Sequence, residues 1–234
     1  MDKSIFAGLQ KLTLLDFPGY VACTLFTKGC NMRCPFCHNA SLVVRAQEQK
    51  MYTNEEIMYF LNKRVGILDG VAITGGEPTL MPGLYDFIKD AKALGYKVKL
   101  DTNGTSPTIL ERLVSDGLLD YVAMDIKNCR ERYGETVGLG DCYDLAPIEE
   151  SKDFLMQGYV DFEFRTTVCK NFHTPEDIVR IGEWLRGYEK YFIQQFKDSG
   201  DIIGDKIEPY SDTEMRELLD KILPFVPNAQ LRGV

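Results

Sequence analysis

The stretch Val21-Ala-Cys-Thr-Leu-Phe-Thr27 is followed at once by Lys28-Gly-Cys30-Asn-Met-Arg-Cys34-Pro-Phe-Cys37. The first part is an uninterrupted run of apolar and β-branched residues, which predicts a buried β-strand. The second part brings three cysteines into eight residues of the loop that leaves this strand. A buried strand that ends in a loop rich in potential ligands is typical of parallel α/β proteins.

Five further apolar runs predict strands, and they are Gly70–Thr74, Tyr96–Asp101, Tyr121–Ile126, Val160–Val168 and Tyr191–Gln195. Between and after them lie helical patterns with recognisable starts. These starts are Thr53 with Glu56, Pro82, Ser106-Pro107, Thr174-Pro175 with Asp177, and Ser211 with Glu214. Gly95 and Gly117 are suited to end two of the helices. A sixth helix is expected within 144–158, where one is needed to connect the fourth and fifth strands.

Strand and helix alternate about six times, and right-handed crossovers of this kind give a parallel sheet. Six units are too few to close an eight-fold barrel. We therefore predict an α/β fold, an open, partial (βα)6 TIM-like barrel with parallel strands, in preference to a doubly wound sheet. No linker or change of composition interrupts residues 1–234, so one domain is the simplest organisation.

Charge and cysteine usage exclude several classes of protein. The chain has 27 Lys plus Arg against 35 Asp plus Glu, and a net charge of −8 excludes a generally basic nucleic-acid binder. No stretch resembles a signal peptide or a membrane-spanning helix, so we expect a cytoplasmic protein with no membrane association. Cytosolic thiols are kept reduced, which argues against a disulfide framework for the seven cysteines.

Polar clusters follow four of the predicted strands at the point where each ends. The cysteine loop follows the first strand, and Thr74-Gly-Gly-Glu-Pro78, Asp101-Thr-Asn-Gly104 and Asp125-Ile-Lys127 follow the next three. Because the carboxyl ends of parallel strands lie together at one end of the sheet, we expect these clusters to form one site.

Three thiolates in one loop can hold an iron–sulfur cluster, and a four-iron cluster would then keep one iron open to another ligand. Two other interpretations use the same residues. Cys34-Pro-Phe-Cys37-His38 matches a haem attachment motif, although haem attachment needs export of the chain. Cys30, Cys34, Cys37 and His38 could also form a zinc site, although the adjacent Cys37 and His38 would have difficulty reaching one tetrahedral ion.

The Gly75-Gly76 pair allows close approach of the backbone to a ligand, with N–H groups to meet a polar atom and the Glu77 carboxylate beside them. A Gly-Gly pair after a strand is also a common turn. With only His38 and His173 in the chain, a hydrolytic triad is poorly supported.

The sequence resembles the radical S-adenosylmethionine (SAM) enzymes, whose hallmark is C-x-x-x-C-x-x-C in the loop after the first strand. Cys30, Cys34 and Cys37 match this motif with Phe36 at its aromatic position, and Gly75-Gly76-Glu77 matches the family's G-G-E segment. Further segments resemble the subgroup that activates glycyl radical enzymes, and they are Leu15-Asp-Phe-Pro-Gly19, Cys37-His38-Asn39, Asp101-Thr-Asn103-Gly and Asp125-Ile126-Lys127. The segment 8–19 is similar to activators of anaerobic ribonucleoside-triphosphate reductase.

The resemblance implies a role for each matching residue. Cys30, Cys34 and Cys37 would hold three irons of a [4Fe-4S] cluster, and SAM would chelate the fourth. Residues facing SAM would be Phe36, Cys37, His38, Gly75, Gly76, Glu77, Asp101, Asn103, Asp125, Ile126, Lys127 and Arg165. Asp101, Thr102 and Asp125 would be oxygen ligands of a monovalent cation. The chain departs from some relatives at Gln194-Gln195-Phe196-Lys197, where those relatives have a histidine.

The implied reaction is reductive cleavage of SAM, followed by removal of a hydrogen atom from a glycine of a partner. The implied partner is a glycyl radical enzyme, anaerobic ribonucleoside-triphosphate reductase, with a flavodoxin or ferredoxin as electron donor. A radical SAM enzyme acting on a small molecule, such as a deazapurine precursor, is the closest alternative. A zinc-binding, non-catalytic module is the alternative from a different class.

Overall fold

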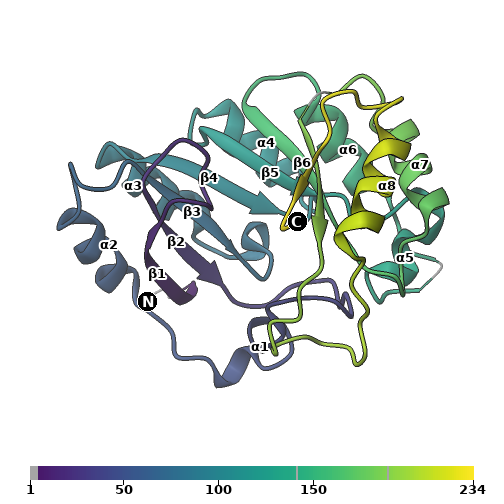
Figure 1. Ribbon diagram of the computed structural model, residues 1–234. Coiled ribbons are helices and arrows are strands. Elements are labelled where there is room, and N and C mark those ends of the chain that lie inside the picture. Colours follow the sequence, from purple (N-terminus) through teal and green to yellow (C-terminus); the bar gives the residue numbers. More distant parts are fainter. Residues whose placement is uncertain (1–4, 141, 189) are drawn as a thin grey trace.

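The computed structural model describes residues 5–140, 142–188 and 190–234. Within them the backbone is built around one eight-stranded sheet (Figure 1). The strands are β1 Phe6–Thr13, β2 Ala22–Thr27, β3 Gly70–Gly75, β4 Lys97–Thr102, β5 Tyr121–Asp125, β6 Asp161–Val168, β7 Tyr191–Gln195 and β8 Gln230–Arg232.

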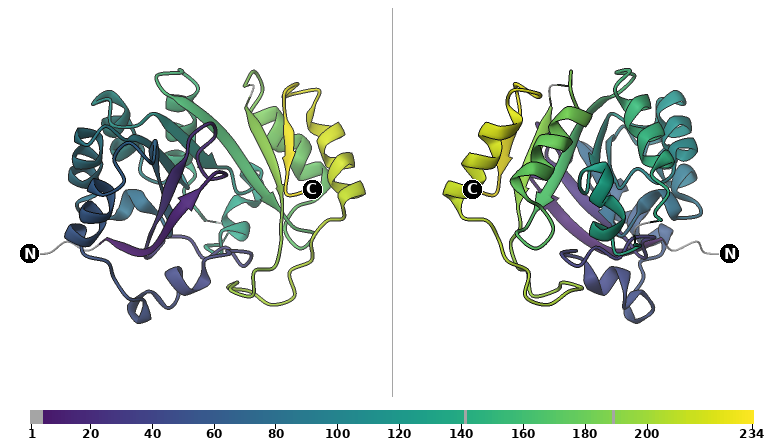
Figure 2. Two further views of the ribbon diagram at one scale, coloured as in Figure 1. Left: turned by 60° about the vertical axis from the view of Figure 1, so that its left-hand side comes forward. Right: turned by 90° about the vertical axis from the view of Figure 1, so that its right-hand side faces the viewer.

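The strands follow one another in the sheet in chain order, from β1 at one edge to β8 at the other. β2 to β8 are parallel, and β1 pairs antiparallel with β2. The sheet curves, and β1 and β8 remain separate edges, as the two views of Figure 2 show. The expected open, partial barrel is confirmed, with the six predicted strands as β2 to β7.

The longer helices cover the outer face of the curved sheet (Figures 1 and 2). The longer ones are α2 Asn54–Asn62, α3 Leu84–Ala93, α4 Pro107–Ser115, α6 Ala146–Leu155, α7 Pro175–Trp184 and α8 Asp212–Ile222, and the short ones are α1 Ala40–Val43 and α5 Tyr133–Thr136. Short 3-10 turns span Ala46–Glu48, Pro78–Leu80 and Arg130–Arg132. The expected capping boxes at Thr53, Thr174 and Ser211 are all formed. The helix start expected at Pro82 is slightly too early, because the N-cap of α3 is Gly83, whose φ is 94°.

The segment that joins β1 to β2 closes the amino-terminal end of the barrel. Phe17 is only 1% exposed, and its ring lies 6.4 Å from that of Tyr121 on β5. A Cβ atom at Gly70 would come within 2.9 Å of the Phe17 ring, so the glycine makes room for it. Asp16 accepts a hydrogen bond of 2.5 Å from the Thr24 hydroxyl and fixes the turn. The apolar plug leaves the polar strand ends at the opposite end of the barrel.

A long segment after β7, residues 196–210, runs back to the loop that follows β2. The N–H of Gly204 donates to the carbonyl of Pro35 at 2.7 Å. The Asp201 carboxylate accepts from the N–H and the hydroxyl of Ser41, the latter at 2.6 Å, and pairs with Arg45 at 2.7 Å. We call residues 196–210 the strap, because they fasten the cysteine loop to the far side of the sheet.

None of the helices in the described part of the chain combines the length and the apolar character needed to cross a membrane.

Candidate functional site

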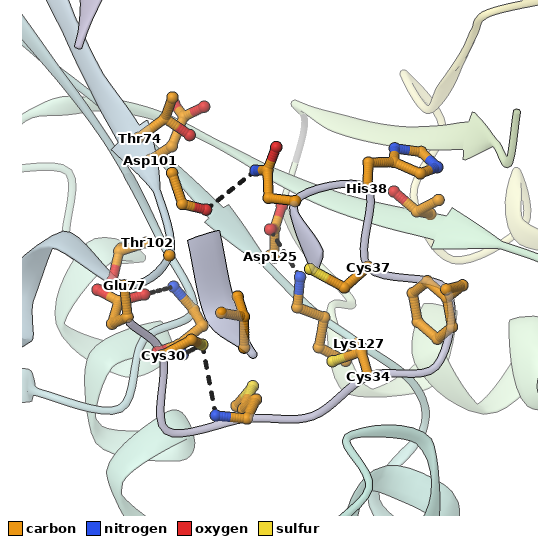
Figure 3. Close-up of a pocket in the computed structure, with 18 of the residues that line it drawn as sticks. Cys30, Cys34, Cys37, His38, Thr74, Glu77, Asp101, Thr102, Asp125 and Lys127 are labelled. Carbon is orange, nitrogen blue, oxygen red and sulfur yellow. Dashed lines mark hydrogen bonds and ion pairs between the residues drawn. The ribbon is translucent and has the colours of Figure 1, made fainter. Parts of the chain in front are cut away.

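A cavity of about 220 Å³ lies at the carboxyl ends of the parallel strands. The three cysteines of one loop face it, opposite residues from β3, β4 and β5 (Figure 3). Its lining includes most of the residues expected from the sequence, namely Cys30, Cys34, Phe36, Cys37, His38, Gly75, Gly76, Glu77, Asp101, Thr102, Asn103, Asp125, Lys127 and Arg165. The four polar clusters therefore do form one site.

Backbone hydrogen bonds hold the cysteine loop at several points. The N–H of Gly29 donates to Leu42 at 2.7 Å, and the N–H of Arg33 donates to Val137 at 2.8 Å. The Arg33 guanidinium turns back onto its own loop and donates to the Cys30 carbonyl at 2.6 Å. The shape of the loop that carries the thiols is thus set by contacts within the protein.

Two of the thiols, those of Cys30 and Cys34, are held in an environment that raises the cost of ionising them. Burial raises the pKa of the Cys34 thiol to about 12, although the nearby Lys127 ammonium acts in the opposite direction. Burial also raises the pKa of Cys30, opposed by the N–H of Met32, which donates to its sulfur at 3.3 Å. Lys127 lies between Asp125 and the cysteine loop (Figure 3). Its charge would compensate thiolates that form on ligand binding.

A single zinc ion does not fit this arrangement. In the described ranges, no three His, Cys, Asp or Glu side chains converge closely enough to hold one metal ion. The His38 ring instead packs against Phe196 of the strap, with ring centroids 5.1 Å apart. A cluster is less demanding, because each thiolate binds a different iron and the three sulfur atoms need not meet at one point. The described residues add no fourth cysteine to the cavity lining, so the donor set fits a four-iron cluster with one open position.

The Gly75-Gly76 pair is explained by contact within the protein. A Cβ atom on Gly76 would lie 1.8 Å from the carbonyl oxygen of Gly29, and one on Gly75 would lie 2.4 Å from the nitrogen of Thr27. The N–H of Gly76 donates to Thr27 at 3.0 Å. The expectation that this N–H meets a ligand is therefore wrong, because the strand end and the cysteine loop pack against each other here.

Glu77 is buried and joins two strand ends. One carboxylate oxygen accepts from the hydroxyls of Thr79 and Thr102 at 2.6 and 2.7 Å, and the other accepts from the N–H of Asn103 at 2.6 Å. Burial raises the pKa of Glu77, and these hydrogen bonds act to lower it. The side chain thereby fixes the position of Asn103, whose amide donates to Cys30 Sγ at 3.7 Å.

Opposite the cysteines, five charged side chains form an alternating chain. Arg165 donates to Asp101 at 3.1 Å and to Asp125 at 2.9 Å, and Lys127 donates to the other oxygen of Asp125 at 2.8 Å. Lys99 donates to the remaining oxygen of Asp101. Burial alone would raise the pKa values of both aspartates, but the neighbouring cations outweigh it and hold them below the usual range.

One expected residue does not face the cavity. Ile126 is fully buried, its N–H donates to Arg165 at 2.8 Å, and its carbonyl accepts from Thr166. Side chains alternate along extended backbone, so Asp125 and Lys127 face the cavity while Ile126 faces away. Sequence reasoning missed the lining residues Met32, Val43 and Thr167, and it assigned no role to Asn39 and Gln194, which also line the cavity. The same period-two alternation along β6, counted from Arg165, could have found Thr167.

The comparison with known families agrees with this geometry. The family model described as the radical SAM superfamily matches residues 24–146, more than half of the chain. The chain belongs to the radical SAM superfamily. Members of this superfamily use a [4Fe-4S] cluster and SAM, and the matched segment carries the cysteine loop and the ends of β2 to β5.

Relatives that match this chain over most of their length identify the class of radical SAM enzyme to which it belongs. A protein of Methanocaldococcus jannaschii named as a glycyl-radical enzyme activating enzyme is 32% identical over 240 residues, covering 99% of this chain and 97% of its own. The pyruvate formate-lyase-activating enzyme of Staphylococcus epidermidis is 31% identical over 214 residues, covering 86% and 84%. The chain is an enzyme of this radical SAM activating class.

Solved structures show the same fold at low identity. SuiB of Streptococcus suis, in a crystal with SAM bound, has a TM-score of 0.68 and 14% identity, and the match covers 88% of this chain. The chain spans about half the length of SuiB, since the match covers 48% of that protein.

Proposed function

We propose that this protein holds a [4Fe-4S] cluster on Cys30, Cys34 and Cys37, binds SAM beside it, and activates a partner glycyl radical enzyme. The observation that carries the proposal is that three thiols of one loop and the polar ends of β3, β4 and β5 share one cavity. When bound there and reduced, the cluster would supply one electron for the cleavage of SAM, and the cleaved SAM would take up the hydrogen atom from the partner's glycine as 5′-deoxyadenosine.

The residues around the cavity have separate tasks in this proposal. Lys127 compensates the negative charge of the thiolates, and with Arg165 it offers positive charge to the carboxylate of SAM. The backbone from Phe36 to His38 lines the adenine, and the segment from Gly75 to Glu77 borders the methionine end. The buried walls exclude water from the reacting groups.

The partner follows from the class and from the resemblance of the opening segment. Activating enzymes of this class are named for glycyl radical enzymes, among them pyruvate formate-lyase. The similarity of segment 8–19 favours anaerobic ribonucleoside-triphosphate reductase. A flavodoxin or ferredoxin would supply the electron, because the sequence has no second run of closely spaced cysteines beside Cys30, Cys34 and Cys37. Seven cysteines without a disulfide among the described residues suit a reducing cytoplasm.

The test is SAM cleavage by anaerobically reconstituted protein with a chemical reductant. About four irons and four sulfides should bind per chain, and 5′-deoxyadenosine should form slowly alone and faster with the reductase. Cys34→Ala should lose the iron and the cleavage, while Cys142→Ala, at an exposed cysteine, should keep both. Zinc without sulfide, or acceleration by a purine-like small molecule and by no glycyl radical enzyme, would contradict the proposal.

A further inference from the structure

The resemblance implies a monovalent cation at Asp101, Thr102 and Asp125. The side-chain oxygens of these residues already take part in hydrogen bonds within the protein. The two oxygens of Asp101 accept from Lys99 and Arg165, and the two oxygens of Asp125 accept from Arg165 and Lys127. The hydroxyl of Thr102 donates to Glu77 at 2.7 Å and accepts from the N–H of Gly104 at 3.1 Å. Each side-chain oxygen of the expected ligand set therefore has a protein partner.

Lys99 occupies the position that gives it this role. It lies two residues before Asp101 on β4, and side chains two apart on a strand share a face. Its side chain is 3% exposed, which is rare for lysine unless the charge is paired. An ammonium group carries the same charge as an alkali ion and donates to the oxygen atoms that would ligate one.

We infer that the ammonium of Lys99 replaces the monovalent cation beside Asp101, so that SAM binding by this protein needs no alkali ion. The two carboxylates are mostly buried, with 15% and 26% of their side chains exposed, and they need compensating charge because an unpaired carboxylate in such a place is unfavourable. Lys99, Arg165 and Lys127 provide three positive charges for these two carboxylates. The chain of pairs therefore carries an excess of one positive charge without any bound metal.

The test compares potassium, sodium and tetramethylammonium chloride at equal ionic strength, since tetramethylammonium has no N–H to donate and is too large to be ligated. The first readout, thermal unfolding without SAM, does not depend on the proposed function. The midpoint of the wild-type protein should agree within about 2 °C in all three salts. A wild-type midpoint that needs potassium or sodium would overturn the inference.

Lys99→Met keeps the aliphatic length and removes the charge. Its midpoint should fall by roughly 5–10 °C in tetramethylammonium and recover substantially in potassium or sodium. Lys99→Arg should stay insensitive to the salt. Lys97→Met is the matched control, because Lys97 is an exposed lysine of the same strand paired with Asp120. A Lys99→Met protein that is unaffected, or that no alkali ion rescues, would show that Lys99 does not replace a cation.

If Lys99→Met does not fold in tetramethylammonium, the double variant Lys99→Met with Asp101→Asn removes both charges and should fold in every salt. A double variant that still requires an alkali ion would contradict the inference.

The second readout, SAM affinity by equilibrium dialysis of the cluster-loaded protein, rests on the proposed function. Wild-type affinity should agree within about twofold across the salts, and Lys99→Met should lose about tenfold in tetramethylammonium and regain it in potassium or sodium. A wild-type affinity that depends on potassium or sodium would overturn the inference. Failure to bind SAM in any salt would instead contradict the proposed function, and the unfolding midpoints would still decide the role of Lys99.

Discussion

Among single residues, Gly76 shows how closely the site depends on packing. Its Cα faces the carbonyl oxygen of Gly29, at a distance that leaves no room for a side chain. The next residue also joins the end of β3 to the start of the cysteine loop, because the Glu77 N–H donates to the carbonyl of Gly29 at 2.8 Å. The position of the loop is therefore set by a contact between two backbones.

We predict that Gly76→Ala lowers the free energy of unfolding by about 3 kcal/mol or more, because the loop must move to relieve the overlap. Iron loading should fall with it. Gly117→Ala is the control, since its φ of 67° is strained for alanine but nothing lies within 4 Å of the added Cβ. That change should cost about 1 kcal/mol and leave iron loading intact. Equal losses in urea unfolding would contradict the packing account.

His173 is a buried titratable residue that holds the loop of Lys127. Its Nε2 donates to the carbonyl of Lys127 at 2.8 Å, and its Nδ1 accepts from the N–H of Cys169. Burial lowers the pKa of His173 to about 4, with the Lys127 and Cys169 backbone contacts and Asp177 acting to raise it and Arg132 acting to lower it.

This shift predicts the sign of a pH effect on stability. Between pH 6.5 and 4 the unfolded chain binds a proton at His173 that the folded chain does not, so stability falls as pH is lowered through this window. The uptake of this proton should lower the free energy of unfolding by about 2 kcal/mol from pH 7 to pH 5. Urea unfolding of cluster-free His173→Gln should show a smaller fall than the wild type over the same range. If the free energy of unfolding fell equally with pH in the two proteins, this role of His173 would be contradicted.

At the scale of elements, the strap connects β7, the last of the six predicted strands, to the cysteine loop. Asp201→Ala removes the acceptor for Ser41 and the partner of Arg45. We predict a loss of about 1 kcal/mol in stability and faster removal of iron by a chelator. Asp205→Ala, at an exposed position of the same strap, is the control. Identical rates of iron removal for the two variants would show that the strap does not secure the loop.

The interior elements could be predicted from the sequence, and the edges could not. β2 to β7 are apolar runs and helices such as α7 and α8 carry capping boxes, so local chemistry identifies them. Sequence reasoning misses β1 because exposed polar residues such as Gln10 and Lys11 interrupt any apolar run, and it misses β8 because that strand is only three residues long. Both are held by pairing with a neighbouring strand, which a single segment does not reveal.

The site shows the same division between local and non-local information. The cysteine spacing and the polar strand ends predict which residues meet, because parallel strands end at one face. The sequence does not reveal that Lys99 pairs with Asp101, although a lysine two residues before that aspartate on a buried strand is the available signal. The use of the Gly76 N–H within the protein depends on the tertiary contact with Thr27 and was not predictable.

On the scale of the whole molecule, the barrel is plugged by Phe17 at one end, carries the polar cavity at the other, and stays open between β1 and β8. A closed barrel would admit only small molecules to the cavity. An open one leaves room for a protein loop to reach the cavity, provided that the loop first leaves its own fold. We therefore expect slow encounter with the partner and local opening of the partner.

The most direct measurement is electron paramagnetic resonance of the partner after anaerobic incubation with this protein, reductant and SAM. With anaerobic ribonucleoside-triphosphate reductase we predict a glycine-centred radical on the reductase, absent when SAM is omitted and absent with the Cys34→Ala protein. Replacement of the acceptor glycine of the reductase by alanine should abolish the signal. Release of 5′-deoxyadenosine without a radical on the reductase or on any other glycyl radical enzyme tested would contradict the account.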